Sequence, residues 1–148
     1  MDDALGETMR TRALIQGQAA KEILGEMLWT KVESLATLDD LLDRHMPSQL
    51  RDPEAIADVV GAFLGESVRK ATGAAWEREG DGEPYLSLPD GRRLHPLARA
   101  RRRLSEGRRA SLAAYGEACV AYARDPAAPD PAEAMTAARP RWPFGGRK

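Results

Sequence analysis

The chain contains 148 residues, with 22 basic and 23 acidic side chains and a formal net charge of −1. This length suits one domain that buries a core without a staple, and no apolar run approaches the ~18–20 residues of a membrane-spanning helix. The single cysteine, Cys119, excludes an internal disulfide and suits a reducing compartment. Because Met1-Asp2-Asp3 also lacks the basic start of a signal peptide, we expect a cytoplasmic protein without membrane association.

Residues 1–50 predict an N-terminal helical segment. We expect residues 1–7 to be frayed and a long amphipathic helix to begin near Thr8, because apolar side chains then recur at helical spacing. These positions are Leu14, Ile15, Ala19, Ile23, Leu24, Met27, Leu28, Val32 and Leu35. Gly17 and Gly25 weaken the pattern without marking a definite end. A helix of this length also permits homodimerisation.

A second, short helix is predicted after Thr37, which forms a capping-box pattern with Asp40. It should end before Pro47, because the residue that precedes a proline disfavours the helical conformation. Adjacent acids on a helix are normally solvated, so we expect Asp39 and Asp40 to lie at the surface.

The best-defined element is a capped helix over residues 53–72. Asp52 suits the N-cap, Pro53 the first helical position and Glu54 the positive end of the helix dipole. The apolar stripe comprises Ile56, Val59, Val60, Phe63, Leu64 and Val68. Gly73 suits the position just after the helix, where the backbone turns left-handed.

Two glycines, Gly61 and Gly65, lie four residues apart on one face of this helix. Each costs about 1 kcal/mol relative to alanine, which indicates close packing against another element. Glu66 adjoins the apolar stripe. We therefore expect it to be partly buried and paired with an arginine from residues 92–109.

Residues 75–95 predict a small antiparallel meander that begins with Trp76. Turn sequences occupy residues 80–82 and 89–91, where glycine accepts a positive φ and proline presets φ. Between the turns, Leu86 and Leu88 alternate onto one face, as in a half-buried strand.

Residues 92–109 contain eight arginines and one acid, Glu106. The candidate partner-binding side chains are Arg92, Arg93, Arg99, Arg101, Arg102 and Arg103, with Trp142 in the tail. A guanidinium group offers a planar fork of donors, so contacts with carboxylate or phosphate groups of a partner are one interpretation. Pairing with the acidic helices of the same chain is the other, and charge runs more often end that way.

Helices are predicted over residues 97–106 and 109–124, and residues 52–124 should pack with the N-terminal segment as one mostly helical α+β domain. Residues 125–148 are rich in alanine and proline and cannot bury a core. We expect a disordered tail, with one or two helical turns near residues 131–138. Trp142 lies among basic residues at its end, which suits either a docking peptide or a solvated tail.

The sequence contains no phosphate-binding glycine loop, no zinc-spaced Cys/His cluster and no nucleophile elbow. We therefore expect no catalytic residues, no metal and no cofactor, and hence no enzyme activity. A site assembled from scattered residues, such as Glu66, His95 and Arg92, stays open as an alternative.

Part of the chain resembles a group of small bacterial α+β domains of unknown function, some of them similar to immunity-type proteins that neutralise toxins. The matching residues are Phe63-Leu64-Gly65-Glu66, Gly73, Trp76, the run from Leu86 to Arg92, and Pro96. The resemblance covers residues 52–122 and implies an α+β fold without enzyme activity. It assigns Gly61, Gly65, Glu66 and Trp76 no role beyond the structural one given above.

The sequence thus favours a non-enzymatic protein-interaction module, with an adaptor or immunity-like role in a bacterial cytoplasm. Binding of nucleic acid or another anionic ligand through residues 92–109 is the alternative. The near-zero net charge and the absence of aromatic residues among these arginines argue against nucleic acid.

Overall fold

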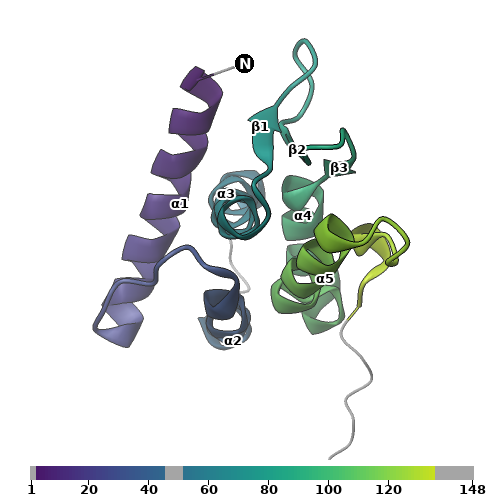
Figure 1. Cartoon of the computed structure of the whole chain (residues 1–148). Coiled ribbons are helices and arrows are strands. Elements are labelled where there is room, and N and C mark those ends of the chain that lie inside the picture. Colours follow the sequence, from purple (N-terminus) through teal and green to yellow (C-terminus); the bar gives the residue numbers. More distant parts are fainter. Residues whose placement is uncertain (1–2, 46–51, 136–148) are drawn as a thin grey trace, which may run out of the picture.

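The computed structural model describes residues 3–45 and 52–135. It confirms a mostly helical α+β fold. The helices are α1 (Asp3–Leu24), α2 (Leu35–His45), α3 (Pro53–Thr72), α4 (Pro96–Glu106) and α5 (Leu112–Arg124), the strands are β1 (Ala75–Glu77), β2 (Tyr85–Ser87) and β3 (Arg93–Leu94), and the short 3-10 turns are η1 (Val32–Ser34), η2 (Gly107–Ala110) and η3 (Pro131–Glu133). Helix α3 lies at the centre, with α1 on one side and α4 and α5 on the other (Figure 1).

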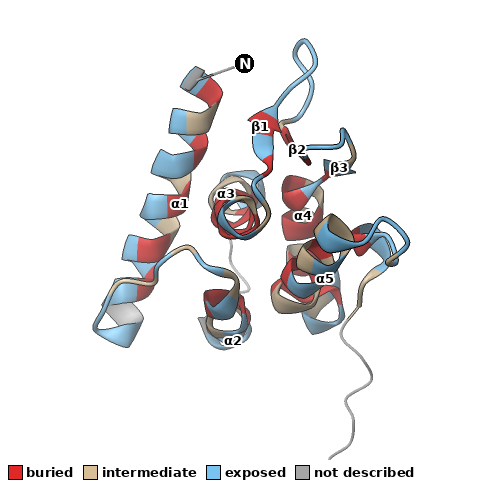
Figure 2. Ribbon diagram, viewed as in Figure 1, coloured by how far each residue is buried: buried red, intermediate tan, exposed pale blue. Residues whose placement is uncertain are grey.

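Helix α3 begins and ends as the sequence predicts. The Asp52 carboxylate accepts a hydrogen bond from the Ala55 amide at 3.1 Å, and Gly73 closes the helix at φ 80°. Every residue from Val60 to Val68 is buried, so the middle of the helix is covered on all sides (Figure 2). A helix in this position is the core around which the other elements pack.

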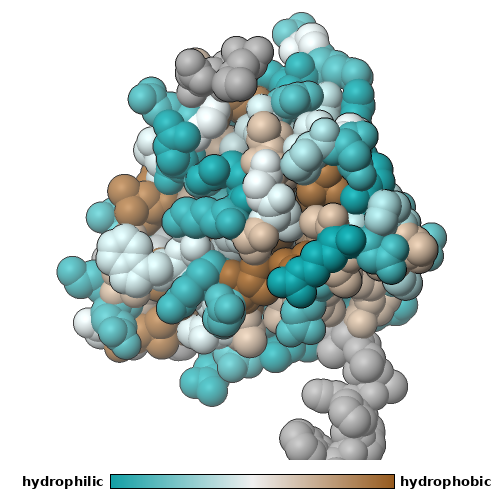
Figure 3. Space-filling view, viewed as in Figure 1, coloured by the Kyte–Doolittle hydropathy of each residue, from teal (hydrophilic) through white to brown (hydrophobic). Residues whose placement is uncertain are grey.

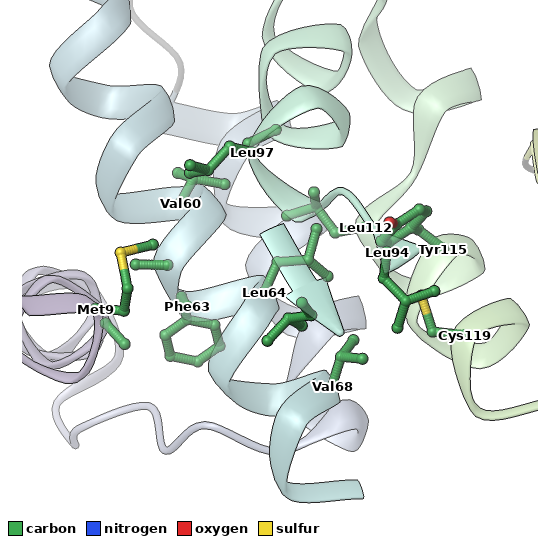
Figure 4. Close-up of a cluster of buried hydrophobic side chains, with 14 of the residues drawn as sticks. Met9, Val60, Phe63, Leu64, Val68, Leu94, Leu97, Leu112, Tyr115 and Cys119 are labelled. Atoms are coloured by element: carbon green, nitrogen blue, oxygen red, sulfur yellow. The ribbon is translucent and has the colours of Figure 1, made fainter. Parts of the chain in front are cut away.

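The core brings side chains from all the major helices against α3 (Figure 4). Figure 4 shows Met9, Val60, Phe63, Leu64, Val68, Leu94, Leu97, Leu112, Tyr115 and Cys119 within one cluster. Phe63 points toward Met9 of α1, whereas Leu64 points toward the side of α5. A single hydrophobic cluster therefore joins the N-terminal helix to the α+β part of the chain.

The two glycines of α3 lie where other elements approach most closely. A Cβ atom added at Gly61 would overlap the Leu97 side chain, and one added at Gly65 would overlap the Trp76 ring and lie 3.1 Å from Cγ of Pro96. The glycine-bearing face of α3 thus receives both the start of α4 and the first strand.

The meander is antiparallel with strand order β1-β2-β3, as predicted. Trp76 pairs with Leu86 and Leu86 with Leu94, so three buried side chains line up across one face. The turn at residues 89–91 is closed by the hydrogen bond from the Gly91 amide to the Leu88 carbonyl at 2.8 Å.

The predictions for the N-terminal helix are wrong in three respects. Helix α1 already begins at Asp3, and it ends at Leu24 because Gly25 adopts φ 84°. Its buried face is formed by Leu5, Met9, Ala13, Gly17 and Ala20. Leu14 and Ile15, which the periodicity assigned to the core, are exposed by 46% and 50%. This face combines Leu5 and Met9 with the small residues Ala13, Gly17 and Ala20, so the size of the apolar side chains did not identify it.

The later boundaries differ from the predictions by a few residues. Helix α2 begins at Leu35, directly after η1, so Thr37 lies inside it. Helix α5 begins at Leu112 because the Ser111 hydroxyl accepts a hydrogen bond from the Ala114 amide at 3.0 Å.

The first part of the predicted tail, residues 125–135, is ordered. It contains η3 within the predicted helical turns, and Pro131 is buried. Residues 136–148, including Trp142, lie outside the described residues. No helix in the described ranges combines the length and apolarity that a membrane crossing needs.

Candidate functional site

Most arginines of residues 92–109 are paired with acids of the same chain. The ion pairs are Arg92–Asp90, Arg93–Glu79, Arg101–Glu83, Arg102–Glu106, Arg103–Asp39, Arg103–Asp43, Arg108–Asp40 and Arg108–Asp43. Two of these arginines also make cation–π contacts. The guanidinium carbons of Arg92 and Arg93 lie 4.3 Å from the ring centroids of Tyr122 and Tyr85, respectively. Of the two interpretations, the geometry therefore favours intramolecular pairing.

Arg103 and Asp39 form the innermost of these pairs. Their side chains are exposed by 2% and 1%, and Arg103 Nε donates to Asp39 Oδ1 at 2.7 Å. Asp39 also accepts hydrogen bonds from the Ser111 hydroxyl and from the amides of Leu112 and Ala113, at 2.9 to 3.0 Å. One carboxylate thus joins α2, α4 and the start of α5.

The expectation that Asp39 is solvated is wrong, and Arg103 is not on the surface assigned to it. Asp40, the neighbouring acid, is exposed and pairs with Arg108. Helical spacing puts Asp39 beside the apolar stripe of Leu35 and Leu42 and Asp40 on the opposite face, a signal that the prediction did not use. Asp39 caps a helix because α5 packs against it and its first-turn amides, which have no partner within the helix, donate to the carboxylate.

Asp43 links the buried pair to the surface. Partial burial acts to raise the pKa of Asp43, but hydrogen bonds from Arg103 and Arg108 outweigh it and hold that pKa below its usual value. A carboxyl group with a lowered folded-state pKa contributes stability above its unfolded pKa of about 4 and loses it as the pH falls through the folded value.

Replacing Asp43 with asparagine is therefore expected to lower stability at pH 7 and to flatten the loss of stability below about pH 4. Denaturant midpoints at neutral and acidic pH measure this. Asp81→Asn is the control, because its exposed carboxylate has no ion-pair partner in the described part of the chain. A parallel pH profile for Asp43→Asn and the wild type would contradict the expectation.

Arg99 differs from its neighbours because it has no carboxylate partner in the described ranges. Its Nη2 atom donates to the Pro131 and Ala132 carbonyl oxygens at 3.3 and 3.1 Å, and the guanidinium carbon lies 5.0 Å from the Tyr115 ring centroid. The residue is exposed by only 2%. Its Nη1 atom is buried and has no hydrogen-bond partner among residues 3–45 and 52–135.

Tyr115, whose ring contacts the Arg99 guanidinium, and Cys119 are buried in the core. The Tyr115 hydroxyl accepts a hydrogen bond from the His95 amide at 2.8 Å. Burial raises the pKa of the Cys119 thiol to about 12, so the group stays protonated at neutral pH. A protonated thiol is a poor nucleophile, as expected for a cysteine that fills space.

Glu66 is buried, but its partners differ from the predicted one. It accepts hydrogen bonds from Trp76 Nε1 at 2.7 Å and from Arg69 Nε at 2.8 Å. The pairing arginine comes from its own helix and not from residues 92–109. Through Trp76, Glu66 fixes the first strand against α3.

Glu66, His95 and Arg92 do not form a common site. Glu66 faces the α1 side of α3, His95 lies beside the Tyr85 ring, and Arg92 donates to the Tyr122 carbonyl and to Asp90. Within residues 3–45 and 52–135, no group of His, Cys, Asp and Glu side chains is placed to hold a metal ion.

A groove runs along the C-terminal half of α3 and consists of two adjoining hollows. The first, about 240 Å³, is lined by Arg10, Ala13, Leu14, Met27, Leu28, Trp29, Thr30, Glu66 and Lys70. The second, about 460 Å³, is lined by Thr30, Lys31, Val32, Glu33, Ser67, Lys70, Ala71, Glu117, Val120 and Arg124. The hydrogen bond from Lys70 Nζ to the Thr30 hydroxyl separates them. This groove was not predicted from the sequence.

The groove has an aromatic rim. Trp29, in the loop after α1, is exposed by 62%, and Leu14 beside it is exposed by 46%. In the space-filling view the hydrophobic surface forms separate spots among hydrophilic side chains (Figure 3). Tryptophan is common among the anchor residues of protein interfaces, so Trp29 beside the hollow is a candidate contact residue.

Comparison of the chain with protein-family models, with curated proteins and with solved structures found no match. The resemblance to immunity-type domains therefore stays a prediction.

Proposed function

We propose that this chain is a non-enzymatic protein-interaction module, with an adaptor or immunity-like role, that binds an acidic partner segment in the groove along α3. The observation that carries the proposal is Trp29, a large aromatic side chain exposed by 62% at the rim of the groove. Leaving such a side chain in water has no benefit for the fold, whereas tryptophan is a frequent anchor of protein interfaces.

The charges of the groove indicate the chemistry of the partner. Arg10, Lys31, Lys70 and Arg124 line it, and none of them has a carboxylate partner in the described part of the chain. Against them stand Glu33 and Glu117, since Glu66 is already neutralised by Arg69. The excess of free cations favours a partner segment that carries carboxylates around an apolar anchor residue.

The arginines of residues 92–109 are a weaker candidate for this interface. Arg93, Arg101 and Arg102 would have to exchange existing ion pairs for new ones, which gains little free energy at a solvated surface. The same argument disfavours nucleic-acid binding, which needs guanidinium groups that are free to neutralise phosphates.

Trp29→Ala is expected to weaken the binding of a groove-directed peptide by about 2 kcal/mol, or roughly thirtyfold in Kd. Peptides are first selected with the purified wild-type chain from a display library of random short sequences, and their Kd is then measured by calorimetry. We expect acidic residues around an aromatic or aliphatic anchor in the selected sequences. Lys70→Glu should also weaken binding, because it reverses a charge in the middle of the groove.

Arg93→Glu is the matched control, because it reverses a charge of the arginine segment at an exposed position away from the groove. Loss of binding in Arg93→Glu, with Lys70→Glu unaffected, would move the interface to the arginines and refute the groove. Light scattering of the free chain tests whether a second copy of this chain binds in the groove. A dimer that Trp29→Ala dissociates would mean that a second copy of this chain fills the groove.

A further inference from the structure

Arg99 is a buried cation with unused hydrogen-bonding capacity. A guanidinium group has five N–H donors, yet the only partners of Arg99 in the described residues are two carbonyl oxygens, and both contact Nη2. Its Nη1 atom has none. Burial and the nearby charge of Arg102 lower the pKa of Arg99, which shows that its surroundings disfavour the charge. None of the ion pairs among the described residues includes Arg99.

The carbonyl groups that reach Arg99 belong to residues 125–135, here called the strap. Arg102, three residues after Arg99 on α4, donates from Nη1 to the Ala132 carbonyl at 3.1 Å. Pro131 is the buried residue of the strap. The strap is therefore held by the buried ring of Pro131 and by hydrogen bonds from two arginine side chains of α4.

The strap is an acidic, proline-rich peptide whose carboxylates do not reach Arg99. Its acids are Asp125, Asp130 and Glu133, and its prolines are Pro126, Pro129 and Pro131. The carboxylates of Asp125 and Asp130 accept hydrogen bonds from nearby amides of the strap itself, at 2.9 Å. Neutral carbonyl groups therefore occupy the position in which a carboxylate would bond more strongly.

We propose that Arg99 forms a binding site for a carboxylate of an acidic, proline-containing partner peptide, and that the strap occupies this site as an internal competitor, whereas Arg102 is already paired with Glu106. A carboxylate can bind a guanidinium group through two parallel hydrogen bonds and would use Nη1 as well as Nη2. The site is separate from the groove along α3, so the inference does not depend on the proposed function.

Competition by the strap lowers the apparent affinity, because only the fraction of molecules with a displaced strap can bind the peptide. Weakening the strap should therefore strengthen binding without altering the site. Pro131→Gly in the full-length chain does this, since it removes the buried ring and the fixed φ of proline.

The probe is a fluorescent synthetic peptide that copies residues 125–133, with aspartate in place of the alanine that corresponds to Ala132. A second peptide carries asparagine at the same place. By fluorescence anisotropy, Pro131→Gly should bind the aspartate peptide about tenfold tighter than the wild-type chain does. The asparagine peptide, and the double variant Pro131→Gly/Arg99→Gln, should each bind roughly 10- to 100-fold more weakly.

Equal binding of the two peptides, or binding that Arg99→Gln leaves unchanged, would overturn the proposal. Hydrogen exchange provides a test that needs no variant. The amides of Ala132, Glu133 and Ala134 are hydrogen-bonded within the strap, so the aspartate peptide should accelerate their exchange in the wild-type chain. Unchanged exchange at saturating peptide would refute displacement, including in the case that Pro131→Gly does not fold.

Discussion

Replacing Asp39 with alanine is expected to lower the free energy of unfolding by about 3–5 kcal/mol. The change leaves the Arg103 guanidinium, exposed by 2%, without its buried counter-charge. It also removes the acceptor of the Leu112 and Ala113 amides at the start of α5. Urea titration followed by circular dichroism measures the change.

Two further variants test whether the effect comes from the buried charge. Asp40→Ala removes the adjacent, exposed carboxylate and should cost no more than about 1 kcal/mol. Asp39→Ala combined with Arg103→Met removes both charges, and its cost should be smaller than the sum of the single costs by about 1–3 kcal/mol. Additive costs would show that the pair contributes little and that Asp39 acts as a helix cap alone.

Gly65→Ala is expected to destabilise the protein by about 1–3 kcal/mol, although alanine is the better helix former. The added methyl group would overlap the Trp76 ring, which Glu66 holds by a 2.7 Å hydrogen bond and which therefore cannot easily move aside. Gly65→Val should destabilise the protein further, because the two additional methyl groups on Cβ have no space beside the Trp76 ring. Thermal and chemical unfolding measure both variants.

Gly6→Ala in α1 is the matched control. Its added methyl group would lie 3.3 Å from a terminal nitrogen of the Arg10 side chain, which is flexible and can move. We expect a neutral or slightly stabilising change there, in line with helix propensity. If Gly65→Ala were also neutral, the close packing of α3 against the sheet would be disproved.

The elements that the sequence predicted well have their signals in adjacent residues. Asp52, Pro53 and Gly73 define α3 because caps and positive φ act over one or two residues. The turn at residues 89–91 and the antiparallel meander follow from turn chemistry and alternation, whereas the sequence did not predict which residues pair across the strands. The N-terminal prediction failed because the buried face of α1 combines Leu5 and Met9 with alanines and a glycine, while the large side chains of Leu14 and Ile15 are exposed.

The site was predicted less well, because its contacts join residues that are far apart in the sequence. Arg103 contacts Asp39 across 64 residues, and Arg99 contacts the Ala132 carbonyl across 33. The sequence shows that arginines are dense and that acids are plentiful elsewhere. It does not show which arginine meets a carboxylate, because this depends on how helices pack and not on spacing.

By itself the sequence determined the fold class, the position and ends of α3, the meander, and the close approach at Gly61 and Gly65. These features depend on backbone conformation and on steric space within a few residues. Tertiary structure alone decided that Asp39 pairs with Arg103 and caps α5, that Arg99 has no carboxylate partner in the described residues, and that a groove rimmed by Trp29 lies along α3. Burial and charge pairing are set by what other segments bring to a residue, so they become known only once the helices are packed together.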